Sequence, residues 1–155
     1  MKRVGVISDT HGLLRPEAVQ ALRGADLILH AGDVGRQELL DELSRLAPVV
    51  AVRGNVDRGL RDLPLTEIVE VGGRLLYLIH ILEDLDLDPA AAGFAAVIYG
   101  HSHRPSITRK NGVLYLNPGS AGPRRFDLPL SVAEILVNEQ GLSARLIRLR
   151  VRAKG

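Results

Sequence analysis

Residues 2–12 read KRVGVISDTHG, a short apolar run that ends in polar side chains and a glycine. The β-branched residues within Lys2–Ser8 predict a strand, because such side chains pack well on a pleated sheet. The apolar stretch is too short and runs too directly into an acid to be a secretion signal. Asp9 and His11 follow it at once. The segment therefore predicts a first strand with a carboxylate and an imidazole at its carboxyl end.

The same arrangement recurs further along the chain. Apolar runs at Asp26–His30 and Val49–Arg53 predict two more buried strands. Helices are predicted between the strands at Arg15–Arg23 and Gln37–Leu46, where apolar residues recur at helical spacing. A β-α-β-α-β order implies right-handed crossovers and parallel strands.

The second half of the chain is dominated by hairpin signals, at Gly72-Gly73, Asn111-Gly112 and Glu139-Gln140-Gly141. The paired strands predicted around these turns are Glu67–Val71 with Arg74–His80, Ser106–Arg109 with Val113–Asn117, and Leu130–Val137 with Leu142–Leu149. A short helix is predicted at Asp88–Gly93 and a further strand at Ala95–Tyr99. Parallel units followed by hairpins predict two packed mixed sheets with helices outside, in a single domain over residues 1–155.

Polar side chains come at, or within three residues after, the ends of five predicted strands: Asp9, Asp33, Asn55, His80 and His101. In parallel α/β sheets the carboxyl ends of the strands face one edge, where ligands bind. Carboxylate, amide and imidazole groups together suit divalent ions such as Mn²⁺, Zn²⁺, Fe²⁺, Co²⁺ or Ni²⁺. Two such ions about 3.5–4 Å apart can hold a phosphate, ionise a water and stabilise both the attacking and the leaving oxygen.

Composition narrows the class of protein. The 155 residues are 46% hydrophobic and include no Cys, which fits a globular domain and excludes disulfides and thiolate metal sites. The net charge is only +2 and aromatic residues are few, so a basic groove for nucleic acid is not supported. No apolar run approaches the roughly 20 residues that span a bilayer. We expect a cytoplasmic protein with neither membrane nor nucleic acid as its partner.

The candidate motifs stand in a fixed order. They are Asp9-Thr10-His11-Gly12, Gly32-Asp33-Val34, Gly54-Asn55-Val56-Asp57, Ile79-His80, Gly100-His101-Ser102-His103 and Asn117-Pro118-Gly119-Ser120. This set resembles the calcineurin-like metallophosphoesterases, specifically their small single-domain bacterial and archaeal phosphodiesterase branch. The resemblance implies an α/β (α+β) fold, a four-layer αββα sandwich of two mixed sheets flanked by helices. It also implies a phosphodiesterase that hydrolyses a small phosphate ester with a water or hydroxide activated between two divalent metal ions.

The resemblance also implies the metal ligands. They are Asp9, His11 and His103 for the first ion, Asn55, His80 and His101 for the second, and Asp33 as a bridge between the two. The ions could be Mn, Ni, Fe, Co or Zn, and the sequence leaves a homo-oligomer open.

Three of these ligands are also the predicted catalytic residues, namely Asp33, Asn55 and His101. Asn55 and Arg104 are the predicted substrate-binding residues, because Arg104 follows a ligand loop and a guanidinium can hold a phosphate with two hydrogen bonds. Arg58 is a further candidate for the same role.

Three positions depart from the family pattern. Val56 stands where larger members carry a His that helps the leaving group depart, which favours esters with good leaving groups. Val34-Gly35-Arg36 stands where larger members have a second acid and an Arg. Ile81 stands where the family usually has Gly after its fourth ligand. Because a β-branched residue resists the backbone angles that Gly permits, His80 is expected to be presented differently and the second metal to be held more weakly.

Each motif also has an explanation without function. Asp9 could cap the following helix and Asn55 could be a turn residue, but four of the five His occupy expected positions, which favours the metal site. His30 is predicted to lie in the core or to orient a ligand loop by hydrogen bonding. Asp57 is predicted to be a helix cap and Arg125 a surface charge.

The alternative function is a catalytically weak protein-interaction scaffold of the same fold, as in a eukaryotic retromer subunit. Donor side chains at all seven ligand positions favour the enzyme over this scaffold. A nuclease is disfavoured by the small size of the chain, the lack of a capping domain and the missing basic groove.

Overall fold

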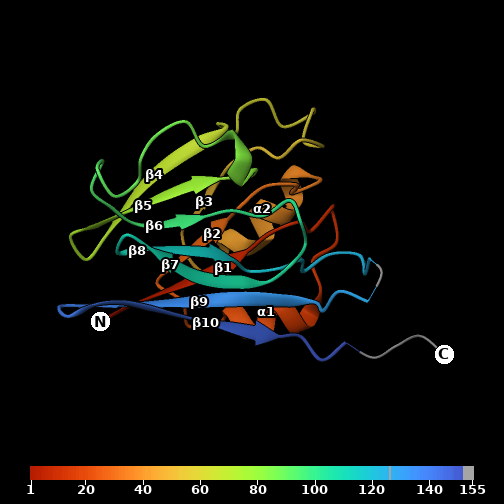
Figure 1. Cartoon of the computed structure of the whole chain (residues 1–155). Helices are drawn as coiled ribbons and strands as arrows, with labels where there is room; N and C mark the ends of the chain where they lie inside the picture. Colours follow the sequence, from red (N-terminus) through yellow and green to blue (C-terminus); the bar gives the residue numbers. More distant parts are fainter. Residues whose placement is uncertain (126, 152–155) are drawn as a thin grey trace.

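The computed structural model describes residues 1–125 and 127–151, in which two five-stranded mixed sheets face each other (Figure 1). Residues 126 and 152–155 of the expected domain lie outside the described residues. The elements are β1 (Lys2–Ile7), α1 (Pro16–Leu22), β2 (Leu27–His30), α2 (Gln37–Ser44), β3 (Val49–Ala51), β4 (Thr66–Val71), β5 (Arg74–Ile79), the 3-10 turn η1 (Leu82–Asp84), β6 (Phe94–Ile98), β7 (Ser106–Lys110), β8 (Val113–Asn117), β9 (Ser131–Asn138) and β10 (Gly141–Arg148).

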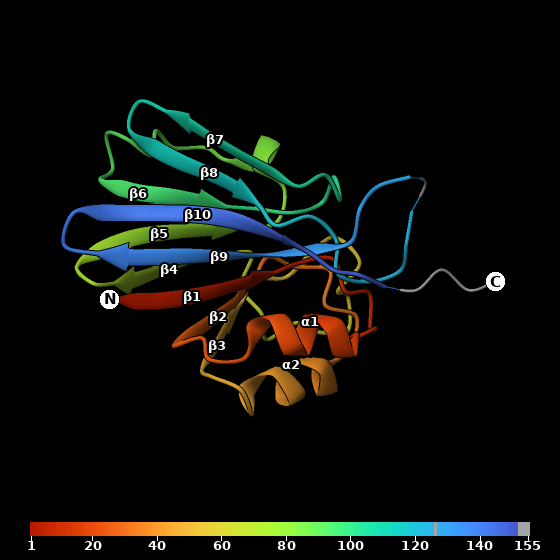
Figure 2. The ribbon, with the colours of Figure 1, turned by 90° about the horizontal axis from the view of Figure 1, so that it is seen from below.

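The first sheet has the strand order β10-β9-β1-β2-β3. As predicted, β1, β2 and β3 are parallel, and β9 and β10 add an antiparallel hairpin. Helices α1 and α2 cover the outer face of this sheet (Figure 2). Their apolar stripes lie in its core, where Leu22, Leu39 and Leu43 are buried. The helical periodicity of the sequence therefore identified the covered face correctly.

The second sheet has the order β4-β5-β6-β8-β7, with a hairpin at each edge and three parallel strands in the middle. Its inner face packs on the first sheet, so that Leu78 and Ile98 share a core with Val6 and Ile135. Two mixed sheets are thus confirmed. On the outer face of the second sheet, the only helical element among the described residues is η1, and Leu82 packs there with neighbouring loop residues.

The prediction of a short helix at Asp88–Gly93 is wrong, because this segment forms turns. The carboxylate of Asp88 accepts the backbone N–H groups of Ala90 and Ala91, at 3.1 and 3.4 Å. Asp88 therefore caps a single helical turn, in which the Ala92 N–H bonds to Asp88 O at 3.0 Å, and no second turn follows. Gly93, at a φ of 84°, then turns the chain into β6.

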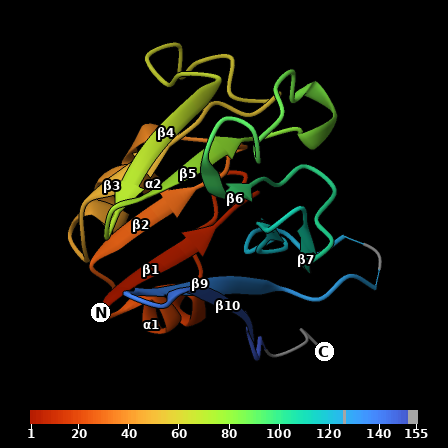
Figure 3. The same ribbon diagram turned by 60° about the vertical axis from the view of Figure 1, so that its left-hand side comes forward.

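The carboxyl ends of several strands meet at one edge of the molecule. Figure 3 shows β1, β2 and β5 running toward the same side. The loops that follow β1, β2, β3, β5 and β6 carry the predicted ligands, so the fold places them together. In the part of the chain that the structure describes, no helix is long and apolar enough to cross a membrane.

Candidate metal centre

Asp33 lies at the centre of the predicted site. Its Oδ2 atom is 3.7 Å from His11 Nε2 and 3.2 Å from His80 Nε2, so it faces two histidines that come from different sheets. On one side, Asp9 Oδ1 is 3.5 Å from His103 Nε2. The rings of His11 and His103 lie next to each other, with centroids 5.4 Å apart. These residues form the first cluster.

The second cluster lies on the other side of Asp33. Asn55 Oδ1 is 3.0 Å from His80 Nε2 and 3.2 Å from His101 Nδ1. The rings of His80 and His101 are 5.4 Å apart and nearly perpendicular. All seven residues predicted from the sequence as ligands are therefore brought together, in two groups that share Asp33.

In each carboxylate, one oxygen accepts hydrogen bonds from the protein and the other faces the site. Asp9 Oδ2 accepts the Ser8 hydroxyl at 2.8 Å and the His101 backbone N–H at 3.1 Å. Asp33 Oδ1 accepts the Val56 backbone N–H at 3.1 Å. The other oxygen of each acid faces the imidazoles. The hydrogen bonds fix the orientation of both acids and leave one oxygen of each for a ligand.

Whether a cation fits here can be judged from the buried polar atoms that have no hydrogen-bond partner. Among the described residues, Asp9 Oδ1, His11 Nε2 and His103 Nδ1 are buried and make no hydrogen bond. Ligand atoms of Asp9, His11 and His103 lie within 4.8 Å of one another, and so do those of Asp9, Asp33 and His80. A buried polar atom without a partner is costly, and a bound cation would remove that cost. Oxygen and imidazole donors fit a divalent ion.

The His80 ring is held by a backbone carbonyl. Its Nδ1 donates to Ala31 O at 2.7 Å, which leaves Nε2 to face the oxygens of Asp33 and Asn55. A metal-binding imidazole is commonly oriented in this way. Burial alone would lower the pKa of His80, but its hydrogen bond to Asp33 and the charges of Asp9 and Asp33 raise it. The acids thus favour positive charge at this position.

The charges in the site shift other pKa values as well. Burial is the main reason that the pKa of Asp9 is raised to about 6, and Asp33 acts in the same direction whereas His80 opposes it. Burial, with the charge of Arg125 adding to it, lowers the pKa of His103 to about 4. A divalent ion would stabilise the anionic acid and the neutral imidazole together, because a metal ligand must be deprotonated.

The predicted ligands also share an unusual backbone. Five of them have a positive φ: Asp9 at 56°, His11 at 46°, Asp33 at 55°, His101 at 74° and His103 at 63°. Residues with side chains rarely adopt this conformation, which persists only where the surrounding structure enforces it. Such strain is typical of functional sites and here coincides with the residues singled out from the sequence.

Two glycines allow the loops to approach the acids. A Cβ atom on Gly54 would lie 2.1 Å from Asp33 Oδ1, and one on Gly100 would lie 2.7 Å from Asp9 Oδ2. Both contacts are too short for any side chain. The glycines beside Asn55 and His101 are therefore required for close approach, as the motifs predict.

Asp57 has a larger role than the predicted helix cap. It is buried, and its carboxylate accepts the backbone N–H groups of Val34, Gly35 and Gly54, at 3.0, 3.0 and 2.9 Å. Among the described residues, no helix begins at Asp57 or directly after it. Asp57 instead ties the Asp33 loop to the Asn55 loop. The acid at the end of Gly54-Asn55-Val56-Asp57 was the sequence signal for this role.

His30 orients ligand loops, which is one of the two roles predicted for it. Its Nε2 lies 3.0 Å from the Thr10 hydroxyl, and its Nδ1 accepts the Gly32 backbone N–H at 3.1 Å. Since Thr10 precedes His11 and Gly32 precedes Asp33, this completely buried ring joins the first two ligand loops.

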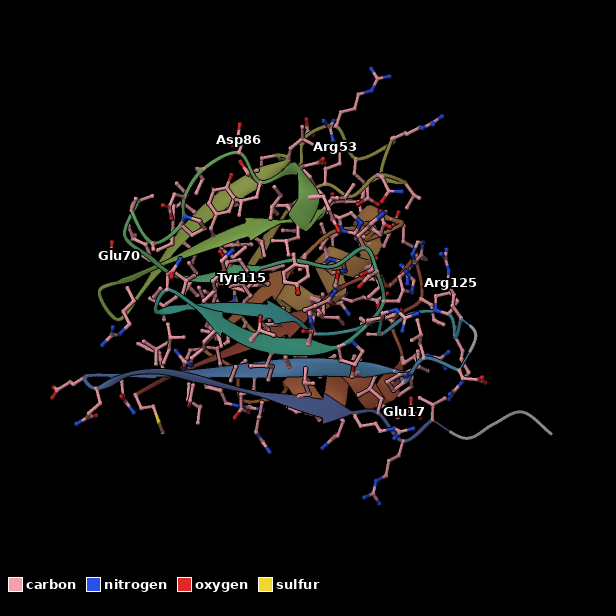
Figure 4. All side chains as sticks on the ribbon, viewed as in Figure 1. Glu17, Arg53, Glu70, Asp86, Tyr115 and Arg125 are labelled. Carbon is pink, nitrogen blue, oxygen red and sulfur yellow. The ribbon has the colours of Figure 1, made fainter. Side chains whose placement is uncertain are left out.

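Three other residues named from the sequence can now be placed. Ile81 has φ −109° and ψ 112°, ordinary extended backbone, so the expected conflict with a β-branched residue does not arise. Arg104 is exposed, and its backbone N–H bonds to Ser102, so its role toward substrate stays a prediction. Arg125, at the right of Figure 4, is exposed, as a surface charge is predicted to be, and its charge contributes to lowering the pKa of both His11 and His103. No motif spacing pointed to it.

Comparison with known proteins agrees with this geometry. Residues 1–140 match the calcineurin-like phosphoesterase superfamily domain. The chain belongs to this superfamily. It is 38% identical to a probable metallophosphoesterase of Methanothermobacter thermautotrophicus, over 94% of this chain and 91% of that protein. It is 28% identical to a phosphodiesterase of Escherichia coli K12, over 94% of this chain and 98% of that one.

A solved structure shows the same fold. An archaeal phosphodiesterase superposes with a TM-score of 0.79 at 22% identity, over 95% of this chain and 99% of that one. At this level of identity the superposition establishes the arrangement of the two sheets. The seven-residue cluster thus lies in a metallophosphoesterase fold.

Asp57→Ala should destabilise the protein by about 3 kcal/mol or more, because two buried N–H groups and one partly buried N–H group would lose an anionic acceptor. Urea unfolding of the metal-free protein measures this change. Asp62→Ala, which removes a nearby exposed acid, is the matched control and should have little effect. A loss below about 1 kcal/mol for Asp57→Ala would show that the tie between the two loops is not a major source of stability.

The buried His30 predicts a pH dependence. Burial, with the charge of His80 adding to it, lowers its pKa to about 3 from 6.5, so between these values the unfolded chain binds a proton that the folded protein excludes. Its contribution to stability is fully present above about pH 6.5 and is lost as the pH falls toward 3. Between pH 6 and pH 4, wild-type protein in chelator should therefore lose about 1.4 kcal/mol per pH unit more than His30→Gln. Equal pH slopes in urea unfolding would contradict this.

Proposed function

We propose that the chain is a binuclear metal-dependent phosphoesterase that hydrolyses phosphate diesters. The observation that carries the proposal is the position of Asp33, whose Oδ2 faces His11 of one cluster and His80 of the other. The proposed ligands are Asp9, His11 and His103 for one ion, Asn55, His80 and His101 for the other, and Asp33 for both. The phosphodiesterase among the relatives supports a diester substrate.

The chain's own residues would divide the remaining work. When bound, two divalent ions, of Mn, Ni, Fe, Co or Zn, supply Lewis acidity and an activated water. Asn55 points its Oδ1 atom at His80 and His101, so its amide N–H groups are available to donate to a phosphate oxygen. Arg125 brings positive charge to the side of His11 and His103. Arg104 is the second proposed cationic contact to the substrate.

The interaction scaffold is the weaker alternative for this chain. A scaffold of this fold has no need for orphaned buried donors, strained ligand loops or an acid fixed between two histidines. Retention of all seven donors, each within 3.7 Å of at least one other, supports an enzyme. A panel of metals and aryl phosphate mono- and diesters on chelator-stripped protein tests this choice directly, and no turnover with any metal would favour the scaffold.

Asp33→Ala should be the most damaging ligand substitution. It removes the shared anion between two cations that would then repel each other, so activity should fall about 100-fold or more. Steady-state kinetics with bis(p-nitrophenyl) phosphate and calorimetric metal titration measure the two effects. Glu70→Ala, an exposed acid on β4, is the control (Figure 4). Near-normal turnover of metal-loaded Asp33→Ala would sink the binuclear proposal.

The rate should depend strongly on the leaving group. Val56, 48% exposed, occupies the position of the missing acid, and Asp57 is engaged by three backbone N–H groups and cannot replace it. Without a side chain to protonate the departing oxygen, good leaving groups should react far faster. A series of methyl aryl phosphates should give a steep plot of log kcat/KM against leaving-group pKa. Val56→His should flatten the plot, and a flat wild-type plot would point to an acid elsewhere.

A further inference from the structure

A cleft of about 500 Å³ opens directly beside the candidate metal centre. Asn55 and His80 belong to both, so the cleft begins where the second cluster ends. It runs between the start of β4 and the segment that contains η1. Its volume lies within the range of small-molecule sites, which is about 300–1,000 Å³. A phosphate held at the metal centre would therefore have room for an attached organic group.

The walls of the cleft are largely apolar. Leu65 and Ile79 line it together with the ring of Tyr77, and Leu65 is 61% exposed. Ile81 lines it as well. The position at which this chain departs from the family pattern thus contributes a cleft wall, and its backbone is unstrained. An exposed apolar surface beside a polar centre is typical of a ligand site.

The charges around the cleft are unequal. Apart from His80 of the metal centre, the charged lining residues in the described part of the chain are Asp84, Asp86 and Arg53, so the outer rim carries one net negative charge. Figure 4 shows Arg53 and Asp86 at the same upper side of the molecule. A second anionic group on the substrate would meet this rim at close range and be repelled. A neutral or cationic group would not.

We propose that this cleft binds the organic group of the phosphate ester, and that the group is neutral or cationic and about the size of an aryl ring. The proposal rests on the proposed phosphoesterase function and specifies the substrate class of the same site. Apolar contact with Leu65, Ile79 and Ile81 would favour a ring over a methyl group. Asp84 and Asp86 would select against a second phosphate or a carboxylate.

Binding of phosphonates to the Mn²⁺-loaded protein tests the proposal without depending on turnover, because the C–P bond is not hydrolysed. Calorimetry should show phenylphosphonate binding about 10-fold more tightly than methylphosphonate, since an aryl ring buries apolar area. Thr66→Trp places an indole in the cleft at the exposed start of β4 and should abolish that preference. Thr108→Trp is the matched control, at an exposed position on β7, the opposite edge strand of the same sheet, and should keep it.

The charge of the rim is tested separately and does not depend on the Trp variants. Wild-type protein should bind 2-aminoethylphosphonate more tightly than phosphonoacetate, and Asp84→Asn combined with Asp86→Asn should reduce this difference at least about threefold. An unchanged difference would overturn the selection by charge.

The outcomes distinguish a failure of the cleft proposal from a failure of the proposed phosphoesterase function. If methylphosphonate binds but phenylphosphonate has no advantage, or if the advantage persists in Thr66→Trp, the cleft is not the site of the organic group. If the metal-loaded protein binds neither phosphonate but hydrolyses bis(p-nitrophenyl) phosphate, the cleft proposal alone falls. If it neither binds a phosphonate nor hydrolyses that diester, the phosphoesterase function itself fails and the cleft proposal falls with it.

Discussion

Two carboxylates buried side by side constrain the rest of this structure. Asp9 and Asp33 lie at the ends of neighbouring strands, both nearly inaccessible to water, and like charges at such a position repel each other strongly. The surrounding groups reduce that repulsion. Backbone N–H groups and the Ser8 hydroxyl bind the outward oxygens, while imidazoles face the inward ones. The arrangement remains incomplete without positive charge between the acids, which is the physical basis for a metal centre at this edge.

Holding these acids requires backbone that would not be stable on its own. Positive φ angles at the proposed ligands cost free energy, of the order of 1–3 kcal/mol each. The two rigid sheets supply fixed strand ends, and Asp57 and His30 join the loops to one another. Glycines appear where a side chain would collide with an acid. The strain is therefore local and is supported by an ordinary, well-packed core.

Much of this could be read from the amino-acid sequence, and the reason is periodicity. Apolar runs ending in a polar residue placed the parallel strands, and the spacing of Leu39 and Leu43 placed a helix on the sheet. The length of a helical segment was harder to foresee: Asp88 caps one turn, but Gly93, at a positive φ, leads directly into β6, so no regular helix forms. Asp57 bonds to the loop of Val34 and Gly35, which is far away in sequence, so its motif marked the acid but not the loop to which it binds.

The proposed ligands come from both sheets, so the geometry of the site depends on how the two sheets pack together. Asp9, Asp33 and Asn55 follow strands of the first sheet, whereas His80, His101 and His103 follow strands of the second. The bond from His80 to Ala31 already crosses from one sheet to the other. Metal ions bound by residues of both sheets would fix the two sheets to each other at one end. Altered packing around Leu78 or Ile135, which lie between the two sheets, would shift one sheet relative to the other. Such a shift would then change the distances between the proposed ligands.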